Sequence, residues 1–392
     1  MRFRHSNPLK LLSTGLLLCL LTTDATATLP LTPAPTIQAT GAILLDYHSG
    51  QVLAEQQADL QHYPASLVKI MMSYVVGQAL KTGTIQLSDQ VVVSQEASDR
   101  IKFADSSKMF LKLGQRVPVA DLQKGIIIQS GNDACVAMAE HIAGSESALV
   151  TLMNHYAQAL QLANTRFINV HGLDHPDQYT TARDMARLAS ALIRELPEEY
   201  QHYQQKTFTY NGITQANRNT LLWDSSLQTD GVKTGGTSQA GFNLVASATD
   251  GDRRLIAVVL GAPTAAARAA EGKKWLQWGF RFFERRTIVA AGDVVTKGRV
   301  WFGVQPEVPL GVVEPLSLTL PRGRSQAVTT HYQLDGVLKA PLRQHQIVGL
   351  VRFELAGKLL AERPLQVLEP VARGSWLTRC RDTLTLRWHD KP

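Results

Sequence analysis

The stretch YPASLVKIM, residues Tyr63–Met71, begins the helix that decides the fold of the first part of this chain. Pro64 suits the first turn of a helix, where its missing N–H group would have no partner. The positions that follow, as far as Leu80, are apolar almost all round, and a helix without a polar face belongs inside a protein. The sequence therefore predicts a buried helix from about Pro64 to Leu80.

Strand patterns lie on both sides of this helix. The strand patterns cover residues 41–54, 231–234, 242–249 and 254–261, and the other helical patterns cover 119–143, 181–195 and 264–284. His48-Ser49-Gly50 and Asp250-Gly251-Asp252 are turn sequences that predict β-hairpins. A β-rich start and a β-rich return around a helical middle predict an α+β domain over residues 41–287, with helices packed on an antiparallel sheet.

The character of the sequence changes after residue 287. Helical periodicity stops, and short strands alternate with turns such as Pro321-Arg322-Gly323 and Ala356-Gly357-Lys358. This pattern predicts a small all-β, sandwich-like domain over residues 288–370.

The last segment, residues 371–392, has the pattern of an amphipathic helix. Its apolar side chains fall within one arc at 100° per residue, with arginines nearby: Trp376, Leu377, Cys380, Leu384 and Trp388. Aromatic side chains on one face with arginines beside them are typical of a helix that lies on a membrane surface. A helix packed on the β domain, or a frayed terminus, is the alternative.

Residues 1–27 have the features of a signal peptide. A basic start is followed by the apolar run Leu11–Leu21 and by the small residues Ala25-Thr26-Ala27. The apolar run is short for a membrane span, so cleavage after Ala27 and export are predicted. Residues 28–40 are rich in Pro, Thr and Ala, which predicts a linker or an extended arm.

The bulk properties limit the partners. With 392 residues the chain has room for more than one domain, and its formal net charge is +7. In an exported protein this charge favours an anionic membrane or cell-wall polymer as partner over nucleic acid. Cys135 and Cys380 lie far apart in the sequence, so we expect both to be unpaired, with Cys135 buried on a helix.

Three short motifs carry the chemistry: Ser66-Leu67-Val68-Lys69, Ser130-Gly131-Asn132 and Lys233-Thr234-Gly235. A serine hydroxyl needs a base to become a nucleophile, and Lys69 falls on the same helical face as Ser66. Lysine is such a base only where burial and a neighbouring positive charge, here Lys233, lower its pKa. Each motif alone has a purely structural alternative. The first also fits a helix cap with a snorkelling lysine, the second a capping turn, and the third an edge strand.

Together these motifs resemble those of the type-5 low-molecular-mass penicillin-binding proteins, which are serine D-alanyl-D-alanine carboxypeptidases. Further segments resemble the same family: His171–Asp174, Asn217–Asn219, Leu222-Trp223, Trp278–Phe283, Trp301–Gly303 and Leu320–Gly323. The resemblance implies a β-lactamase/transpeptidase-like catalytic domain that removes the terminal D-alanine from peptidoglycan pentapeptides. It also implies covalent acylation by β-lactams, no cofactor, a role in cell-wall biogenesis and cell shape, and peripheral attachment to the periplasmic face of the inner membrane.

The resemblance also implies a role for each motif residue. Ser66 would be the nucleophile, Lys69 its general base, and Ser130 a relay of the proton to the leaving amine. Asn132 would hold Lys69 and the substrate amide, while Lys233 would keep Lys69 neutral.

The resemblance further implies the residues that bind substrate. These are Lys233, Thr234, Gly235, Gly236, Arg218 and Arg268. The backbone N–H groups of Ser66 and Gly236 would form the oxyanion hole, and the arginines suit a carboxylate. A surface or interdomain position is the alternative for Arg218 and Arg268.

Two features of the sequence qualify this interpretation. Many relatives carry histidine where this chain has Gly236, so the backbone N–H group is kept but any side-chain role in deacylation is in doubt. His171 and His175 have a spacing that hints at a metal, but Gly172 and Pro176 place them in a loop and no glutamate completes a zinc-protease motif, so no metal is predicted.

Three other functions compete with this interpretation. A class A β-lactamase shares the nucleophile motif but favours Ser-Asp-Asn, has no use for a β domain, and needs a deacylating glutamate that the loop 171–178 does not show. A DD-endopeptidase uses the same three motifs, although small ones usually lack the β domain. A non-catalytic wall-binding protein would have no reason to keep all five catalytic residues.

Overall fold

The computed structural model describes residues 32–389. The predicted signal peptide, the first four residues of the predicted linker and the side chain of Trp388 lie outside what it describes. Within these limits the chain forms a mixed α/β part and an all-β part, as the sequence predicts.

A five-stranded antiparallel sheet, in the order β2-β1-β9-β8-β7, is the centre of the first part. Its strands are β1 (Gly41–Asp46), β2 (Val52–Gln56), β7 (Gln228–Thr237), β8 (Gly241–Asp250) and β9 (Arg253–Ala262). The β1–β2 and β8–β9 hairpins form at the two predicted turns. β1 thus pairs with β9, the last of these five strands in the sequence, and this pairing closes the domain.

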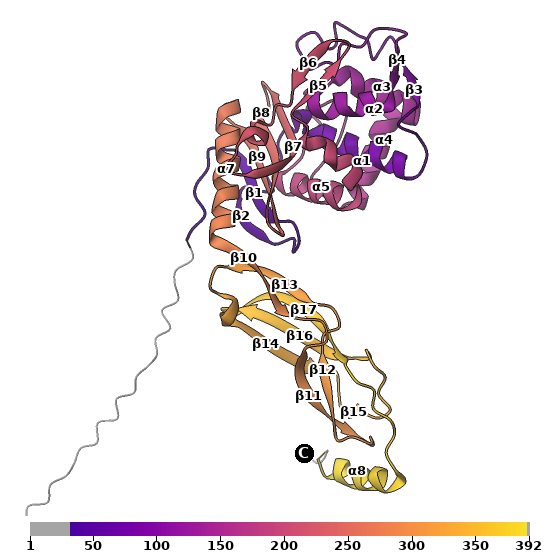
Figure 1. The fold of residues 1–392 in the computed structure, drawn as a ribbon, viewed down its shortest axis with the longest axis vertical. Coiled ribbons are helices and arrows are strands. Elements are labelled where there is room, and N and C mark those ends of the chain that lie inside the picture. Colours follow the sequence, from indigo (N-terminus) through magenta and orange to yellow (C-terminus); the bar gives the residue numbers. More distant parts are fainter. Residues whose placement is uncertain (1–31, 390–392) are drawn as a thin grey trace, which may run out of the picture. The chain divides into compact units, whose positions relative to one another are not determined.

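Both faces of this sheet are buried, and α7 (Ala265–Phe282) covers one of them (Figure 1). Ile43 and Val258 point into a core shared with the other helices, whereas Leu44 and Val259 pack in a core with Trp275 of α7. A strand with two buried faces has no reason to alternate apolar and polar residues. This explains the continuous apolar run of β9, Leu255–Leu260.

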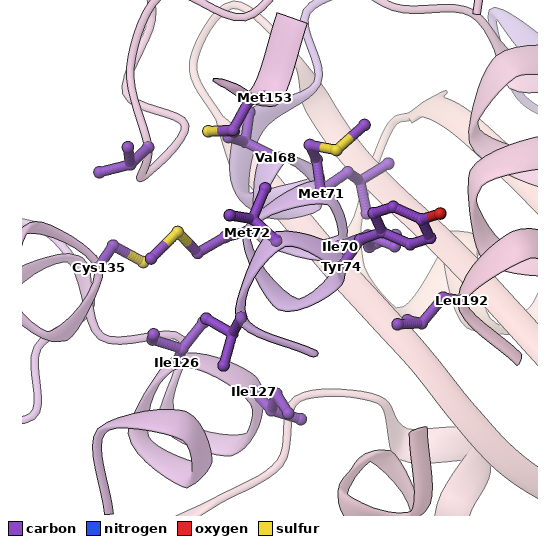
Figure 2. Close-up of a cluster of buried hydrophobic side chains, with 14 of the residues drawn as sticks. Val68, Ile70, Met71, Met72, Tyr74, Ile126, Ile127, Cys135, Met153 and Leu192 are labelled. Carbon is purple, nitrogen blue, oxygen red and sulfur yellow. The ribbon is translucent and has the colours of Figure 1, made fainter. Parts of the chain in front are cut away.

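The opposite face carries the other helices of this part of the chain, which surround α1 (Val68–Lys81). They are α2 (Val119–Lys124), α3 (Asn132–Ala143), α4 (Glu146–Ala159), α5 (Ala182–Glu195) and α6 (Pro197–Tyr200). Figure 2 shows side chains of α1 inside this group, among them Met71 and Met72, with Ile126 and Met153 close by. The predicted buried helix is therefore present, with a short 3₁₀ turn, Ala65–Leu67, in front of it.

The prediction of one helical pattern over residues 119–143 is wrong in detail. After α2 the chain forms a π-helical segment, Gly125–Gln129, and then breaks at Ser130, whose φ is +60°. The next helix, α3, starts at Asn132 and has no side-chain cap. Apolar periodicity continues across this break because both segments are buried, so periodicity alone does not reveal it.

Short hairpins and turns complete this part of the chain. They are β3 (Gln90–Val92) with β4 (Arg116–Pro118), β5 (Thr207–Tyr210) with β6 (Ile213–Ala216), and the 3₁₀ turns Gln201–Gln204 and Thr220–Trp223.

The all-β part contains a two-stranded sheet, β10-β13, and a six-stranded sheet in the order β14-β16-β17-β12-β11-β15. The strands are β10 (Phe283–Val289), β11 (Val294–Trp301), β12 (Glu307–Gly311), β13 (Leu316–Pro321), β14 (Val328–Leu334), β15 (Leu338–Lys339), β16 (Ile347–Leu355) and β17 (Lys358–Val367). Val308, Val351 and Leu365 belong to their shared core. Because β10 follows α7 directly, it spans the boundary predicted at residue 287/288.

The arm before β1 is bound to the sheet domain. Trp275 of α7 donates its indole N–H to the carbonyl oxygen of Pro35 at 2.8 Å, and Gln56 donates to that of Ala39 at 2.8 Å. Ile37 is buried in the same core as Trp275. Residues 35–40 are therefore an extended arm rather than a free linker.

Helix α8 (Trp376–His389) forms within the segment predicted to be an amphipathic helix. Trp376, Leu377 and Leu384 are each about two-thirds exposed, with relative accessibilities of 66%, 64% and 65%. Asp382, on the other side of the helix, is buried and accepts a hydrogen bond from the backbone N–H of Phe302 at 2.7 Å. Among residues 32–389, no helix is both long enough and apolar enough to cross a membrane.

Candidate active site

Ser66 lies in the 3₁₀ turn at the start of α1, where three segments meet. Asn243 of β8 donates its side-chain amide to the carbonyl oxygen of Tyr63 at 2.9 Å. A Cβ atom on Gly235 would lie 3.1 Å from the backbone nitrogen of Ser66, and one on Gly172 would lie 2.1 Å from the carbonyl oxygen of Ala65. Glycine at these two positions allows the backbones to approach the serine this closely.

Lys69 is fully buried one turn after the serine and faces it. Its Nζ atom lies 3.2 Å from Ser66 Oγ and donates to Asn132 Oδ1 at 2.7 Å. It also donates to the backbone carbonyl oxygen of His171. Burial lowers the pKa of Lys69 to about 8, and the positive charge of Arg218 acts in the same direction.

The second motif sits where the π-helical segment ends. Ser130 adopts the left-handed conformation there, and the backbone N–H of Asn132 donates to the carbonyl oxygen of Ser107 at 2.8 Å. This break turns the Ser130 hydroxyl toward β7, where it accepts a hydrogen bond from Lys233 Nζ at 3.0 Å. Ser130 and Asn132 thereby face Lys233 and Lys69, respectively.

The third motif lies on β7 beside the serine. Lys233 is buried, and burial lowers its pKa well below the ordinary value, with the positive charges of Lys69, Arg218 and Arg268 as further causes. Two buried ammonium groups repel each other, so the site favours a state in which one amine is neutral.

Both predicted arginines belong to the same site. Arg268 of α7 donates to the carbonyl oxygen of Gly235 at 2.8 Å, and its guanidinium lies 5.6 Å from the ring centre of Phe242. Arg218 donates to the hydroxyl of Ser107. The positive charge of each guanidinium contributes to the lowered pKa of Lys233.

The two histidines of the His-x-x-x-His spacing have separate surroundings. His171 Nε2 lies 3.3 Å from Glu146 Oε1, and burial lowers the pKa of His171 to about 3, which keeps the ring neutral. His175 lies near the exposed Asp177, at 3.9 Å.

Sequence reasoning missed two groups that shape the site. One is the carbonyl oxygen of His171, because no side-chain pattern marks a backbone acceptor. The other is the buried carboxylate of Asp133, which accepts hydrogen bonds from the backbone N–H groups of Met109 at 2.8 Å, Leu111 at 3.0 Å and Ala134 at 2.9 Å. Asp133 thereby holds the chain that follows Ser107 against α3.

A sequence profile of the D-alanyl-D-alanine carboxypeptidase family matches residues 27–264, and a profile of the C-terminal domain of penicillin-binding protein 5 matches residues 283–373. The chain belongs to the D-alanyl-D-alanine carboxypeptidase family. The carboxypeptidase DacC of Escherichia coli is 52% identical to it over 359 residues, which is 91% of this chain and 90% of the relative. DacA of the same species is 50% identical over 358 residues, 91% of this chain and 89% of the relative.

Solved structures of penicillin-binding proteins have the same fold. Penicillin-binding protein 5 from Haemophilus influenzae superposes with a TM-score of 0.79 at 48% identity, covering 87% of this chain and 99% of that one. Penicillin-binding protein 6B from Escherichia coli superposes with a TM-score of 0.74 at 42% identity, covering 86% of this chain and 98% of that one. These matches confirm the predicted fold class, a peptidase domain followed by an all-β domain, and the predicted enzyme class, a serine D-alanyl-D-alanine carboxypeptidase.

Replacing Asp133 with alanine should destabilise the protein, because three buried N–H groups lose their common acceptor. We expect a loss of about 2–4 kcal/mol in the free energy of unfolding, measured by urea denaturation. Asp105→Ala is the matched control, since Asp105 is exposed and lies in the same stretch of chain. Equal stabilities of the two variants would contradict the proposed anchoring.

Proposed function

We propose that the chain removes the terminal D-alanine of peptidoglycan pentapeptides through an acyl-enzyme on Ser66, with Lys69 as general base. The main support for this proposal is the set of three polar atoms that surround Lys69 Nζ. A neutral amine has two N–H donors and one lone pair. The carbonyl oxygens of Asn132 and His171 take both donors, so the lone pair is left for the hydroxyl of Ser66 at 3.2 Å.

In the proposed reaction, Lys69 takes the proton of Ser66 as Oγ bonds to the carbonyl carbon of the penultimate D-alanine. The C–N bond then breaks, and Ser130 relays the proton from Lys69 to the departing amine, so that Lys69 is again neutral and Ser130 again a hydroxyl. Lys233, which donates to Ser130 Oγ at 3.0 Å, stabilises negative charge on that oxygen during the transfer. Water hydrolyses the resulting ester and regenerates Ser66.

The geometry also supports an assignment of the substrate-binding groups. The side chains of Lys233, Arg218 and Arg268 donate to hydroxyl and carbonyl oxygens among the described residues, not to carboxylates. A carboxylate at the end of the substrate, bound with the help of Thr234, would supply the missing negative charge. Gly235 runs beside the backbone nitrogen of Ser66, which supports an oxyanion hole formed by the N–H groups of Ser66 and Gly236.

The same site accounts for two further proposals. Relatives at high identity are penicillin-binding proteins, so we propose that β-lactams acylate Ser66 as mimics of the D-alanyl-D-alanine end. Position 236 has room for a side chain, since a Cβ atom there would lie 3.4 Å from its nearest neighbour, the carbonyl oxygen of Gly241. We therefore propose that deacylation in this chain proceeds without any side chain at position 236, where the structure has room for one.

Ser66→Ala should abolish labelling by a fluorescent penicillin and the release of D-alanine from a D-Ala-D-Ala-terminated pentapeptide. The measurements are gel fluorescence and mass spectrometry of the peptide, with Ser147→Ala, at an exposed serine of α4, as a folded control. Labelling without release of D-alanine in the unmodified protein would favour the endopeptidase or a very slow deacylation. Absence of labelling would favour the wall-binding function.

The rate of acylation should rise with pH below about 8, because Lys69 must be neutral to accept the proton of Ser66. Well below this pKa, the rate constant for reaction with a penicillin should increase about tenfold per pH unit. Stopped-flow fluorescence between pH 6 and 8 measures it. A flat profile in this range would show that another group acts as the base.

For the location of the protein, we propose export directed by residues 1–27, followed by attachment of α8 to the periplasmic face of the inner membrane. The catalytic domain would span 41–287, the β domain 288–370 and the anchoring segment 371–392. The exposure of Trp376, Leu377 and Leu384 supports this, since Asp382 on the other face makes the contact with the β domain. An apolar helix face left bare in water suits a lipid interface.

A chain ending at Leu368 should bind vesicles containing anionic lipid less well than the full chain. Replacing Trp376, Leu377 and Leu384 together by serine should weaken binding similarly while the Asp382–Phe302 contact remains. Vesicle co-sedimentation is the measurement. Equal partitioning of the shortened and full chains would rule out anchoring by this helix.

A further inference from the structure

The segment 197–204, formed by α6 and the 3₁₀ turn after it, contacts the elements that carry all three motifs. Glu199 accepts a hydrogen bond from Gln123 on α2 and lies beside Ser73 on α1. Its neighbour Tyr200 donates to Asp230 of β7 at 2.7 Å. Ser73 lies one helical turn after Lys69, on the same face of α1. Gln123 lies on the helical run that ends at Ser130, and Asp230 lies on the strand that carries Lys233.

The carboxyl group of Glu199 is deeply buried. The residue is 3% exposed, as is Gln123, whose Nε2 donates to Glu199 Oε2. The other oxygen of each side chain, Oε1 in both, is buried without a hydrogen-bond donor. If Glu199 were ionised, both of these oxygens would be acceptors only, and two buried acceptors without donors are costly.

A single proton removes this conflict. A protonated Glu199 donates from Oε1 to Gln123 Oε1 while Gln123 Nε2 donates to Glu199 Oε2, so an acid and an amide form a two-bond ring. The hydroxyl of Ser73 on α1 lies beside this pair and, like that of Tyr203, is buried without a hydrogen-bond partner. Helix α6, which carries Glu199, packs directly against α1 here.

We infer that Glu199 is a positioning residue for the carboxypeptidase reaction. As a neutral acid paired with Gln123, it holds α1 and the helical run that ends at Ser130 in the arrangement that the site requires. Ionisation of Glu199 loosens that arrangement. The inference rests on the proposed roles of Lys69 and Ser130. It assigns no chemical step to Glu199, which acts through the placement of other groups.

The surroundings of Glu199 favour the neutral acid. Burial raises the pKa of Glu199 to about 8, against the lowering effects of Gln123 and Ser73. Other titratable groups face it from several elements: Tyr203 beside it, Lys81 of α1, Glu195 of α5, and Glu198 and His202 of its own segment. Except for Tyr203, they line a cavity of about 900 Å³ that Glu199 and Gln123 also line, which gives the proton a route to solvent.

The test is the pH profile of acylation by a fluorescent penicillin between pH 6 and 10, for the unmodified chain and for Glu199→Gln. Glutamine resembles the neutral acid and can form the same two-bond ring, but it cannot ionise. The unmodified chain should lose rate above about pH 8, whereas the variant should reach a plateau. At pH 9 the variant should be faster by about tenfold, because one unit above its pKa a carboxyl is about ten parts ionised to one part neutral.

A second readout does not depend on activity. Glu199 holds a proton in the folded protein at pH values where the unfolded chain has released it. The stability from this proton is therefore present below about pH 4.5 and lost as the pH rises through about 8. The thermal unfolding midpoint should fall over this range more steeply for the unmodified chain than for Glu199→Gln.

Glu198→Gln is the matched control, since Glu198 is the exposed neighbour, and it should keep the unmodified profiles. Glu199→Ala, if it folds, should acylate slowly at all pH values. An alkaline loss of rate that persists in Glu199→Gln would overturn the inference, as would a folded Glu199→Gln as slow as Glu199→Ala. No acylation by the unmodified chain would refute the proposed function instead, and the unfolding profiles would still test the protonation of Glu199.

Discussion

The burial of the Lys69 amine is the constraint on which the rest of the site depends. An ammonium group without solvent or a carboxylate partner is unfavourable, so the protein must either supply acceptors or leave the amine neutral. The structure supplies two acceptors, the side-chain oxygen of Asn132 and the backbone carbonyl oxygen of His171. Burial also lowers the pKa of the Lys69 amine, and a second buried lysine, Lys233, lies close by. Each acceptor comes from a different segment, so the lysine can be placed correctly only when those segments are assembled.

The support around the site follows from this requirement. Asn132 has to follow a sharp break in a helical run, and Asp133 fixes the neighbouring chain through its hydrogen bonds to Met109 and Leu111. β7 has to pass close to Ser66, which Gly235 permits. Glu199 and Tyr200 lie farther from the serine. They nevertheless contact α1, α2 and β7, the elements that lead to the three motifs. Ser66 and Lys69 thus rest on a buried polar framework to which Asp133 and Glu199 belong.

Sequence reasoning predicted the parts of the site that are encoded locally. Ser66 and Lys69 share a helix, so their spacing alone places them together, and the turn residues around β8 and β9 predict the hairpin. It failed where buried contacts are made between distant segments. The carbonyl oxygen of His171 has no side-chain signature, and the pairing of Gln123 with Glu199 joins residues that look like ordinary polar positions on surface helices. The break at Ser130 was anticipated only by the interpretation of Ser130-Gly131-Asn132 as a capping turn, because the apolar periodicity continues on both sides of it.

The double-sided burial of the central sheet has a consequence for the folding of the chain. β8 and β9 contain long uncharged runs, which in β9 are rich in valine, leucine and isoleucine, and α7, which covers one face of them, comes later in the chain. Until residues 265–282 have been synthesised, that face has no cover, and uncharged β-forming segments of this kind are prone to intermolecular association. The yield of native protein during synthesis or refolding should therefore depend on protein concentration and on how soon α7 docks, a kinetic hazard that is absent from the finished fold.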